Sequence, residues 1–257
     1  METVGELVVA TRAAGVAELC WWSPDGLPRA TAVVPLHHEG LPTLALHPSQ
    51  WGWARELAAC PEVAMVVSDR RMSQRGWVPG AGYGRMRLVV DADGSVFQGS
   101  LLEQELRKHP PSRACADSPL LRREHWWFLA RLLLVWQPVR VHPVGERTDA
   151  DRHAVMVVVG AAGGLAVDTV DLDGLSLSGR LSPPPGAAVR LFHDFSVPDL
   201  ERWGRHAEHG TWDGRVLTGD GAPRGLLLPQ PPSLRERVRR HRALERECVR
   251  ALRGVSA

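Results

Sequence analysis

The sequence has few cysteines, a single lysine and no long hydrophobic run. The four cysteines lie far apart and lack the close spacing of metal-binding pairs, so we expect buried, reduced thiols. Apolar stretches such as residues 132–136 are too short to cross a bilayer. The first residues also lack a basic region followed by an apolar one, so no secretory signal is expected. These absences predict a cytoplasmic protein that has no membrane segment.

Positive and negative charge are nearly balanced. Lysine and arginine number 31 against 29 acidic residues, which gives a formal net charge of +2. A near-neutral composition is not typical of nucleic-acid-binding proteins, so we expect no nucleic-acid partner. The 257 residues suffice for one large domain or two smaller ones with ample core.

Residues 16–69 contain the clearest structural pattern. Three short apolar runs are rich in Val, Leu, Thr and Trp, and turn residues bound each of them, as is typical of strands. These runs are residues 16–22, 28–36 and 42–47. Helical spacing follows over 50–59, and Pro61 stops it. A continuous apolar run at 62–68 then predicts a strand that is buried on both faces.

Further elements are predicted up to residue 144. They are an opening helix at 2–15, strands at 83–90 and 131–144, and two helices between these strands, the second opening at Ser118-Pro119. Two tryptophan pairs, Trp21-Trp22 and Trp126-Trp127, suggest a surface on which a flat ring could stack. Because adjacent strand residues point to opposite faces, the core or a dimer interface is the favoured place for them.

The segments SPDGLPRATAVVPL, LALHPSQWGWARELAACPEVAMVVSD and GYGRMRLVVDADG follow one another in the order of a known family. They resemble the pyridoxamine 5′-phosphate oxidase-like superfamily of FMN-binding split barrels. The resemblance covers about residues 16–144. It implies a Greek-key split barrel for this part of the chain. Together with the second, smaller α+β domain and the C-terminal helix that the later residues predict, the expected fold class is mainly β with helices (α+β).

In that family the flavin lies at a homodimer interface, and residues after the third strand and at the start of the helix hold its phosphate. The resemblance therefore implies a homodimer, an FMN cofactor and a set of binding residues on these elements. The candidates are Arg29, Thr31, His47, Ser49, Trp53, Arg55 and Arg70.

Trp53 departs from the family's serine-x-x-x-lysine pattern, because it replaces the basic residue. A phosphate needs donors and positive charge, whereas an indole offers one N–H and no charge. Arg55 lies two positions further on and points to a different face of the helix. The expected function is a flavin-dependent oxidoreductase of unknown substrate. The alternatives are a non-catalytic binding or scaffold module that has lost the phosphate site, and a relative that uses deazaflavin or haem.

No pattern in the sequence assigns catalytic residues. Serine–histidine–aspartate, cysteine–histidine and paired-carboxylate arrangements do not stand out, and a flavin enzyme needs none of them.

The loop 69–82 contains Arg70, Arg71, Arg75 and Trp77. These residues suggest either a loop that binds a phosphate and a ring or a solvated connection with surface ion pairs.

Composition divides the chain into four parts. Residues 1–145 form the split-barrel domain, and the polar segment 146–152 reads as a linker. Residues 153–230 form a second β-rich domain of unknown role, for which a degenerate barrel repeat is one interpretation. Residues 231–257 contain a basic C-terminal helix.

The second domain is predicted to contain short strands and one helix. The strands are residues 154–159, 165–172, 175–177, 189–192, 215–218 and 225–228. The helix spans 198–209 and would place His206 and His209 on one face. Together with His193 and Asp194 they suggest a metal site, but surface or turn histidines are favoured, because ligands must converge on one point.

The C-terminal helix is predicted over 233–253. Its apolar stripe is Leu234, Val238, Leu244, Cys248 and Leu252, and its other face holds eight arginines against three glutamates. Such a helix can bind nucleic acid or an anionic surface. Acid–base pairs one turn apart, such as Glu236 with Arg240, favour a packed or dimerising helix instead.

Overall fold

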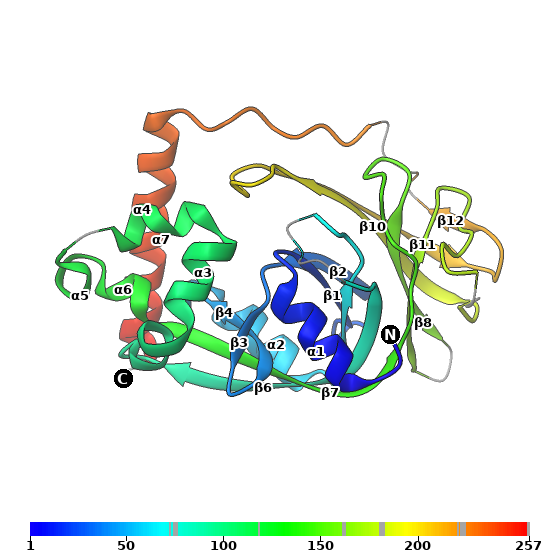
Figure 1. The fold of residues 1–257 in the computed structure, drawn as a ribbon, viewed down its shortest axis with the longest axis horizontal. Coiled ribbons are helices and arrows are strands. Elements are labelled where there is room, and N and C mark those ends of the chain that lie inside the picture. Colours follow the sequence, from blue (N-terminus) through cyan, green and yellow to red (C-terminus); the bar gives the residue numbers. More distant parts are fainter. Residues whose placement is uncertain are drawn as a thin grey trace.

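Two antiparallel sheets, of seven and five strands, form the body of the protein (Figure 1). The computed structural model describes residues 1–71, 73, 77–117, 119–160, 163–179, 183–219, 221 and 225–255. The predicted fold class is confirmed, because the described chain is mainly β with helices between and after the strands.

The seven-stranded sheet has the order β2-β1-β5-β6-β7-β4-β3. Its strands are β1 (Ala17–Trp22), β2 (Pro28–Val33), β3 (Leu36–His38), β4 (Leu41–Leu46), β5 (Val63–Val67), β6 (Gly80–Asp91) and β7 (Arg131–His142). Its two edges, β2 and β3, share no ladder, although only two residues separate them in the sequence. The sheet therefore curls until its edges approach each other and leaves a split between them.

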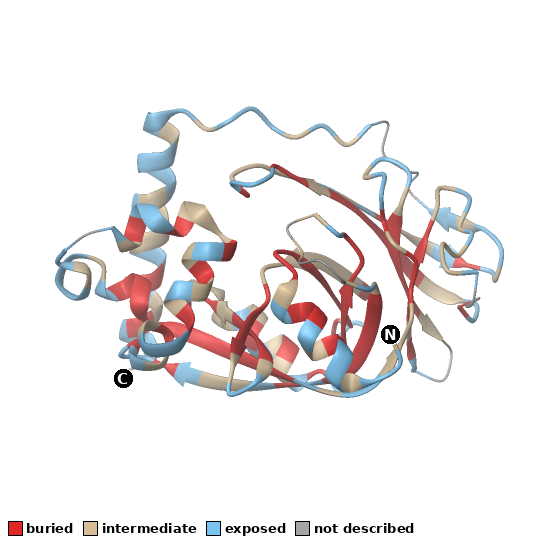
Figure 2. Cartoon of the chain, in the orientation of Figure 1, coloured by how far each residue is buried: buried red, intermediate tan, exposed pale blue. Residues whose placement is uncertain are grey.

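Burial on both faces explains the continuous apolar run of β5. Val63, Met65 and Val67 pack into the core beneath two helices, while Ala64 and Val66 face the second sheet. All five are fully buried, which confirms the predicted strand (Figure 2). Successive side chains of β1 likewise point to these two cores in turn.

Two helices cover the first core. α1 (Val4–Ala13) begins at a capping box, in which Thr3 and Glu6 satisfy each other's backbone N–H groups. η1 (Pro48–Gln50) leads into α2 (Trp51–Ala59), which ends before Pro61. Both helices lie where the sequence predicts them.

Short helical segments fill the connection from β6 to β7. They are η2 (Phe97–Leu101), α3 (Leu102–Lys108), η3 (Pro110–Ser112), α4 (Arg113–Ala116), α5 (Leu121–Glu124) and α6 (Trp126–Leu129). The predicted helix that opens at residues 118–119 is thus two short helices separated by His125, and Ser118 lies outside the described residues. Trp127 is buried whereas Trp126 is exposed, so only one tryptophan of this pair joins the core.

The five-stranded sheet has the order β12-β11-β10-β8-β9. Its strands are β8 (Ala154–Gly160), β9 (Leu165–Val170), β10 (Gly186–Phe195), β11 (Trp203–Trp212) and β12 (Leu217–Gly219). The predicted helix at 198–209 is wrong, because β11 pairs with β10 over its whole length. The predicted strands at 175–177 and 225–228 are also absent from the described structure, apart from one bridge at Ser176.

The two sheets share one hydrophobic core. Cys20 and Tyr83 of the first sheet pack with Val155, Val167 and Val189 of the second. The proposed division of the chain at 146–152 remains a prediction.

A buried polar cluster joins the sheets beside this core. Oε1 of Glu18 accepts hydrogen bonds from Ser68 Oγ at 2.7 Å, Arg147 Nη1 at 3.0 Å and His193 Nε2 at 2.7 Å. Glu18, Arg147 and His193 are all buried. Arg147 follows the first sheet and also donates to the backbone carbonyl of His193 on β10.

The C-terminal helix is α7 (Leu234–Val255), as predicted. Cys248 and Leu252 pack its C-terminal half against the helical segments before β7, whereas Leu234 and Val238 in its N-terminal half are exposed. None of the described helices combines the length and the apolar character needed to span a membrane. All four cysteines are free and buried, as expected.

Candidate functional site

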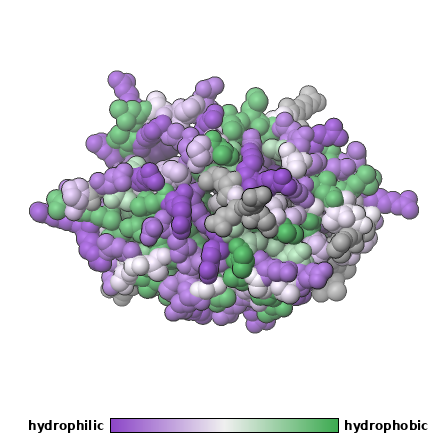
Figure 3. Space-filling view, viewed as in Figure 1, coloured by the Kyte–Doolittle hydropathy of each residue, from purple (hydrophilic) through white to green (hydrophobic). Residues whose placement is uncertain are grey.

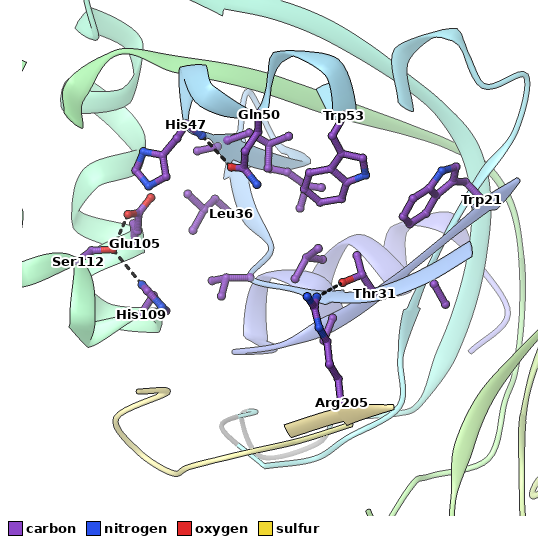
Figure 4. Close-up of a pocket in the computed structure, with 17 residues that line it drawn as sticks. Trp21, Thr31, Leu36, His47, Gln50, Trp53, Glu105, His109, Ser112 and Arg205 are labelled. Carbon is purple, nitrogen blue, oxygen red and sulfur yellow. Dashed lines mark hydrogen bonds between the residues drawn. The ribbon is translucent and has the colours of Figure 1, made fainter. Parts of the chain in front are cut away.

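A cavity of about 570 Å³ lies at the split of the curled sheet (Figure 4). Its walls come from β2 on one side and from β4, η1 and α2 on the other, with α3 and η3 at one end and Arg205 of β11 reaching in from the second sheet beside Thr31. Small and branched apolar side chains line most of it: Ala30, Ala32, Val33, Leu36, Leu44 and Leu46. The cavity is therefore a slot with apolar side chains along its sides and polar groups at particular places.

Two tryptophans form one wall of this slot. Trp21 of β1 and Trp53 of α2 have ring centroids 6.1 Å apart and planes tilted by 49°. Nε1 of Trp21 donates to Glu56 Oε1 at 2.7 Å, which fixes the orientation of the ring. Large aromatic faces in a slot of this kind favour contact with a flat, apolar ligand.

A hydrogen-bonded chain of three side chains occupies the polar end. Ser112 Oγ donates to Glu105 Oε1 at 2.6 Å, and His109 Nδ1 lies 2.9 Å from the same hydroxyl. Because the hydroxyl proton goes to the carboxylate, Nδ1 of His109 must carry the proton that it donates to Ser112. Nε2 of His109 is then an acceptor. Burial lowers the pKa of His109 and favours this neutral form.

A buried arginine supports the same end. Arg131 lies with Nη2 3.5 Å from Glu105 Oε1, and its guanidinium stacks over Phe97 at 3.8 Å and Phe128 at 4.3 Å. Its positive charge balances the carboxylate behind the cavity wall.

His47 is the second histidine on the cavity wall. The side chain of Gln50 accepts a hydrogen bond from its backbone N–H at 3.1 Å, which anchors it at the end of β4. Its Nδ1 is buried and has no hydrogen-bond partner among the described residues. Burial, with the charge of Arg131 as a second cause, lowers the pKa of His47 well below its ordinary value. His47 is thus a neutral imidazole at pH 7.

The lowered pKa of His47 predicts a loss of stability on acidification. The unfolded chain binds the proton near pH 6.5 and the folded chain does not, so stability is lost as the pH falls below that value. We expect His47 to contribute up to about 1.4 kcal/mol per pH unit in this range. Urea unfolding of the wild type and of His47→Gln at pH 7.5 and 5.5 measures it, and the variant should show the smaller decrease. Equal decreases would contradict a neutral imidazole with a lowered pKa at this position.

The structure brings together three of the residues that the sequence suggests. Thr31, His47 and Trp53 line the cavity. Ser49 does not line it and lies instead under α7, with its hydroxyl 3.8 Å from Cys248 Sγ.

The three predicted arginines lie outside the cavity lining. Arg29 pairs with Asp25 of the preceding turn at 3.3 Å, and Arg70 forms a salt bridge with Glu146 at 2.8 Å. Arg55 is exposed on α2. In the loop 69–82, Arg71 contacts Asp69 and Asp194, so its charge is neutralised, while Arg75 falls outside the described residues.

The sequence did not predict the residues of the polar end of the cavity, nor Arg205. Glu105, His109 and Ser112 lie in the connection that precedes β7, where only the fold brings them to the slot. Arg205 lines the cavity beside Thr31 and donates to Thr31 Oγ1 at 3.4 Å. The sequence predicted a helix over 198–209 and therefore did not place Arg205 at the cavity. Among the described lining residues it is the one guanidinium.

The suggested metal site is not formed. His206 and His209 lie on β11, where residues three apart point to opposite faces. His193 is occupied by Glu18 and Arg147. Within the described chain, no group of three or more histidine, cysteine or acidic side chains is arranged to hold a metal ion.

Comparison with known proteins finds similarity at the level of structure. No protein-family model matches the sequence, and no curated protein matches it significantly. An F420 reductase is 20% identical, with 49% of this chain and 88% of that chain covered and a TM-score of 0.35. A pyridoxamine 5′-phosphate oxidase-related, FMN-binding protein from Nostoc punctiforme is 13% identical over 79% and 95%, with a TM-score of 0.35. A heme-binding protein from Mycobacterium smegmatis is 12% identical over 98% of both chains, with a TM-score of 0.36. The similar structures thus include proteins of the superfamily that the sequence resembles, and similarity this low assigns no ligand.

Proposed function

We propose that the cavity binds the ring of a flavin, with FMN as the first candidate, and that the protein is a flavin-dependent oxidoreductase. The observation that carries this proposal is the apolar slot with Trp21 and Trp53 on its wall. Its volume of about 570 Å³ is within the range of about 300–1,000 Å³ found for cofactor and ligand sites. A bound flavin would supply the electron or hydride transfer.

The residues fit the ring better than the phosphate. The slot offers aromatic faces and apolar walls, whereas Arg205 is the one guanidinium among its described lining residues and is itself exposed. A phosphate is normally held by several N–H donors and positive charges. The polar end, with its neutral histidines, suits a donor group of a ligand rather than an anion.

A comparison of FMN with riboflavin tests this distinction. If the ring supplies the binding energy, the two dissociation constants should agree within about threefold, because few charged contacts reach the phosphate. Quenching of tryptophan fluorescence during titration gives both constants. Tighter binding of FMN by tenfold or more would show a phosphate site that the chain supplies elsewhere.

Trp53→Ala is expected to weaken FMN binding about tenfold or more, since stacking of a flat ring on an aromatic side chain contributes about 1–3 kcal/mol. Trp126→Ala is the matched control, because Trp126 is exposed and does not line the cavity. Flavin fluorescence anisotropy measures both variants. An unchanged affinity in Trp53→Ala would place the flavin elsewhere or exclude it.

Haem is the second candidate, and His47 favours it. The neutral imidazole of His47 lines the cavity, and an imidazole of this kind is suited to bind haem iron. Titration with hemin should then give a Soret band that His47→Ala shifts or abolishes.

A deazaflavin has a flat ring similar to that of a flavin, and the tryptophan variants test it equally. A protein that binds none of these rings would instead be a non-catalytic module on this fold.

A further inference from the structure

The exposed side of α7 carries a straight row of arginines, which we call the arginine stripe. Its members are Arg235, Arg239, Arg242, Arg246, Arg250 and Arg253. Successive members are three or four residues apart, the spacing that places side chains on one helix face. All six are exposed. At 1.5 Å per residue the row is about 27 Å long.

Four members of the stripe also line a shallow surface hollow. Arg242, Arg246, Arg250 and Arg253 surround it, together with Glu245 and Val249. Figure 3 shows hydrophilic side chains projecting on the side of the molecule where α7 and α5 lie. The guanidinium groups therefore converge on a common surface rather than pointing in separate directions.

The stripe is not neutralised by the rest of the protein. None of its six arginines forms a salt bridge with a carboxylate of the described residues, whereas Arg237 and Arg240, on another face, pair with Glu201 and Glu236. Like charges one turn apart on a helix face repel each other and destabilise the helix. A row of unpaired arginines thus costs stability, and a partner of opposite charge would offset that cost.

Charge is also segregated along the chain. Eight arginines against three glutamates give α7 a formal charge of +5, so the remainder of the +2 chain carries −3. The near-neutral total, which predicts no nucleic-acid partner, hides this separation. A concentrated basic row on an otherwise acidic protein is the electrostatic pattern of a polyanion-binding surface.

We propose that the arginine stripe binds the phosphate backbone of nucleic acid without reading its sequence. The planar guanidinium forms paired hydrogen bonds with phosphate oxygens, and six of them in a rigid row can contact successive phosphates. This function uses a surface distinct from the cavity and does not depend on a flavin.

The burial of α7 favours nucleic acid over an anionic membrane. A helix that lies in a membrane surface inserts its apolar face among the lipids. Here Cys248 and Leu252 of that face are packed against the protein, and only Leu234 and Val238 are exposed. The stripe continues through the packed half to Arg253, so contact along its whole length is electrostatic.

Binding of a fluorescein-labelled 20-base-pair duplex DNA, measured by anisotropy at 50–200 mM NaCl, tests the proposal. With about four to six phosphates neutralised, the plot of log K against log salt should have a slope of about −3.6 to −5.4. The affinity should fall roughly 10²- to 10³-fold across this range.

The variant Arg239→Gln with Arg246→Gln should flatten the slope by about 1.8 and weaken binding at least about tenfold at 100 mM NaCl. Glutamine keeps the helix propensity. The control is Arg87→Gln with Arg152→Gln, which removes the same charge from two exposed sites off the helix and should bind as the wild type does.

Three results would overturn the proposal. They are no binding of the duplex at 50 mM NaCl, an equal loss of affinity in the control, and binding to phosphatidylserine vesicles without binding to the duplex. Circular dichroism at 222 nm, compared among the variants, shows whether α7 stays folded in each.

Discussion

Replacing Arg147 with methionine is expected to lower the free energy of unfolding by about 3–5 kcal/mol. The substitution leaves the carboxylate of Glu18 buried between the two sheets with its main cationic partner removed. Burial raises the pKa of Glu18, but the hydrogen bond from His193 and the charge of Arg147 outweigh it and lower the pKa overall. Removing the arginine reverses this balance, since an uncompensated buried charge is far more costly than an exposed one.

Urea unfolding followed by circular dichroism measures the loss in Arg147→Met. The control is Arg70→Met, which breaks the exposed pair with Glu146 and should cost less than about 1 kcal/mol. The double variant with Glu18→Gln should recover part of the stability, because it removes the stranded charge. A loss in Arg147→Met no larger than in the control would mean that the cluster does not hold the sheets together.

Replacing Gly84 with alanine is expected to destabilise the protein by about 3 kcal/mol, at the upper end of the usual cost of added volume. A Cβ atom at this position would lie 2.0 Å from the carbonyl oxygen of Gln137 and 2.8 Å from Cα of Pro138. Both atoms belong to the backbone of β7 and have no rotamer to move away. The register of β6 and β7 already shifts between Tyr83 and Gly84, so the close approach is part of this ladder.

Gly52→Ala provides the opposite case on the same chain. Nothing lies within 4 Å of a Cβ at Gly52, which is exposed on α2. Alanine there should raise stability by about 0.5–1 kcal/mol through its helix preference. Thermal unfolding compares the two variants, and a tolerated Gly84→Ala would show that β7 can move away from β6.

Local patterns predicted most of the first half of the chain. Most strands of residues 16–69, helix α2 and the double-sided burial of β5 follow from apolar runs bounded by Pro, Gly and Asp. The strand predicted at 28–36 is instead divided into β2 and β3, which lie at opposite edges of the sheet. The C-terminal helix follows from its spacing of apolar residues. These elements were predictable because neighbours in the sequence determine them.

Strand β11 was not predictable in this way. Its sequence is rich in histidine and charge, and Glu208 is buried only because Arg190 of β10 meets it at 2.7–2.9 Å. A charged residue in a sheet interior carries no local signal of a strand. Pairing with a distant strand determines its conformation instead.

The residues that line the cavity also fall into a predictable group and an unpredictable one. Thr31, His47 and Trp53 lie on elements that the resemblance places around a ligand. His109 and Arg205 come from segments whose position depends on how the connection before β7 and the second sheet fold onto the barrel. No spacing in the sequence indicates that these five residues line one cavity.

The presence of Arg205 in the cavity wall has a consequence for the stability of the protein with a ligand bound. Arg205 belongs to the five-stranded sheet, whereas the remaining lining residues belong to the seven-stranded sheet and its helices. A molecule in the slot therefore touches both sheets and acts as a non-covalent cross-link between them. At a hundred times its dissociation constant it would add about 2.7 kcal/mol to the stability of the folded chain. The melting temperature thus becomes a general detector, through which a library of flat aromatic compounds can be searched before any reaction is known.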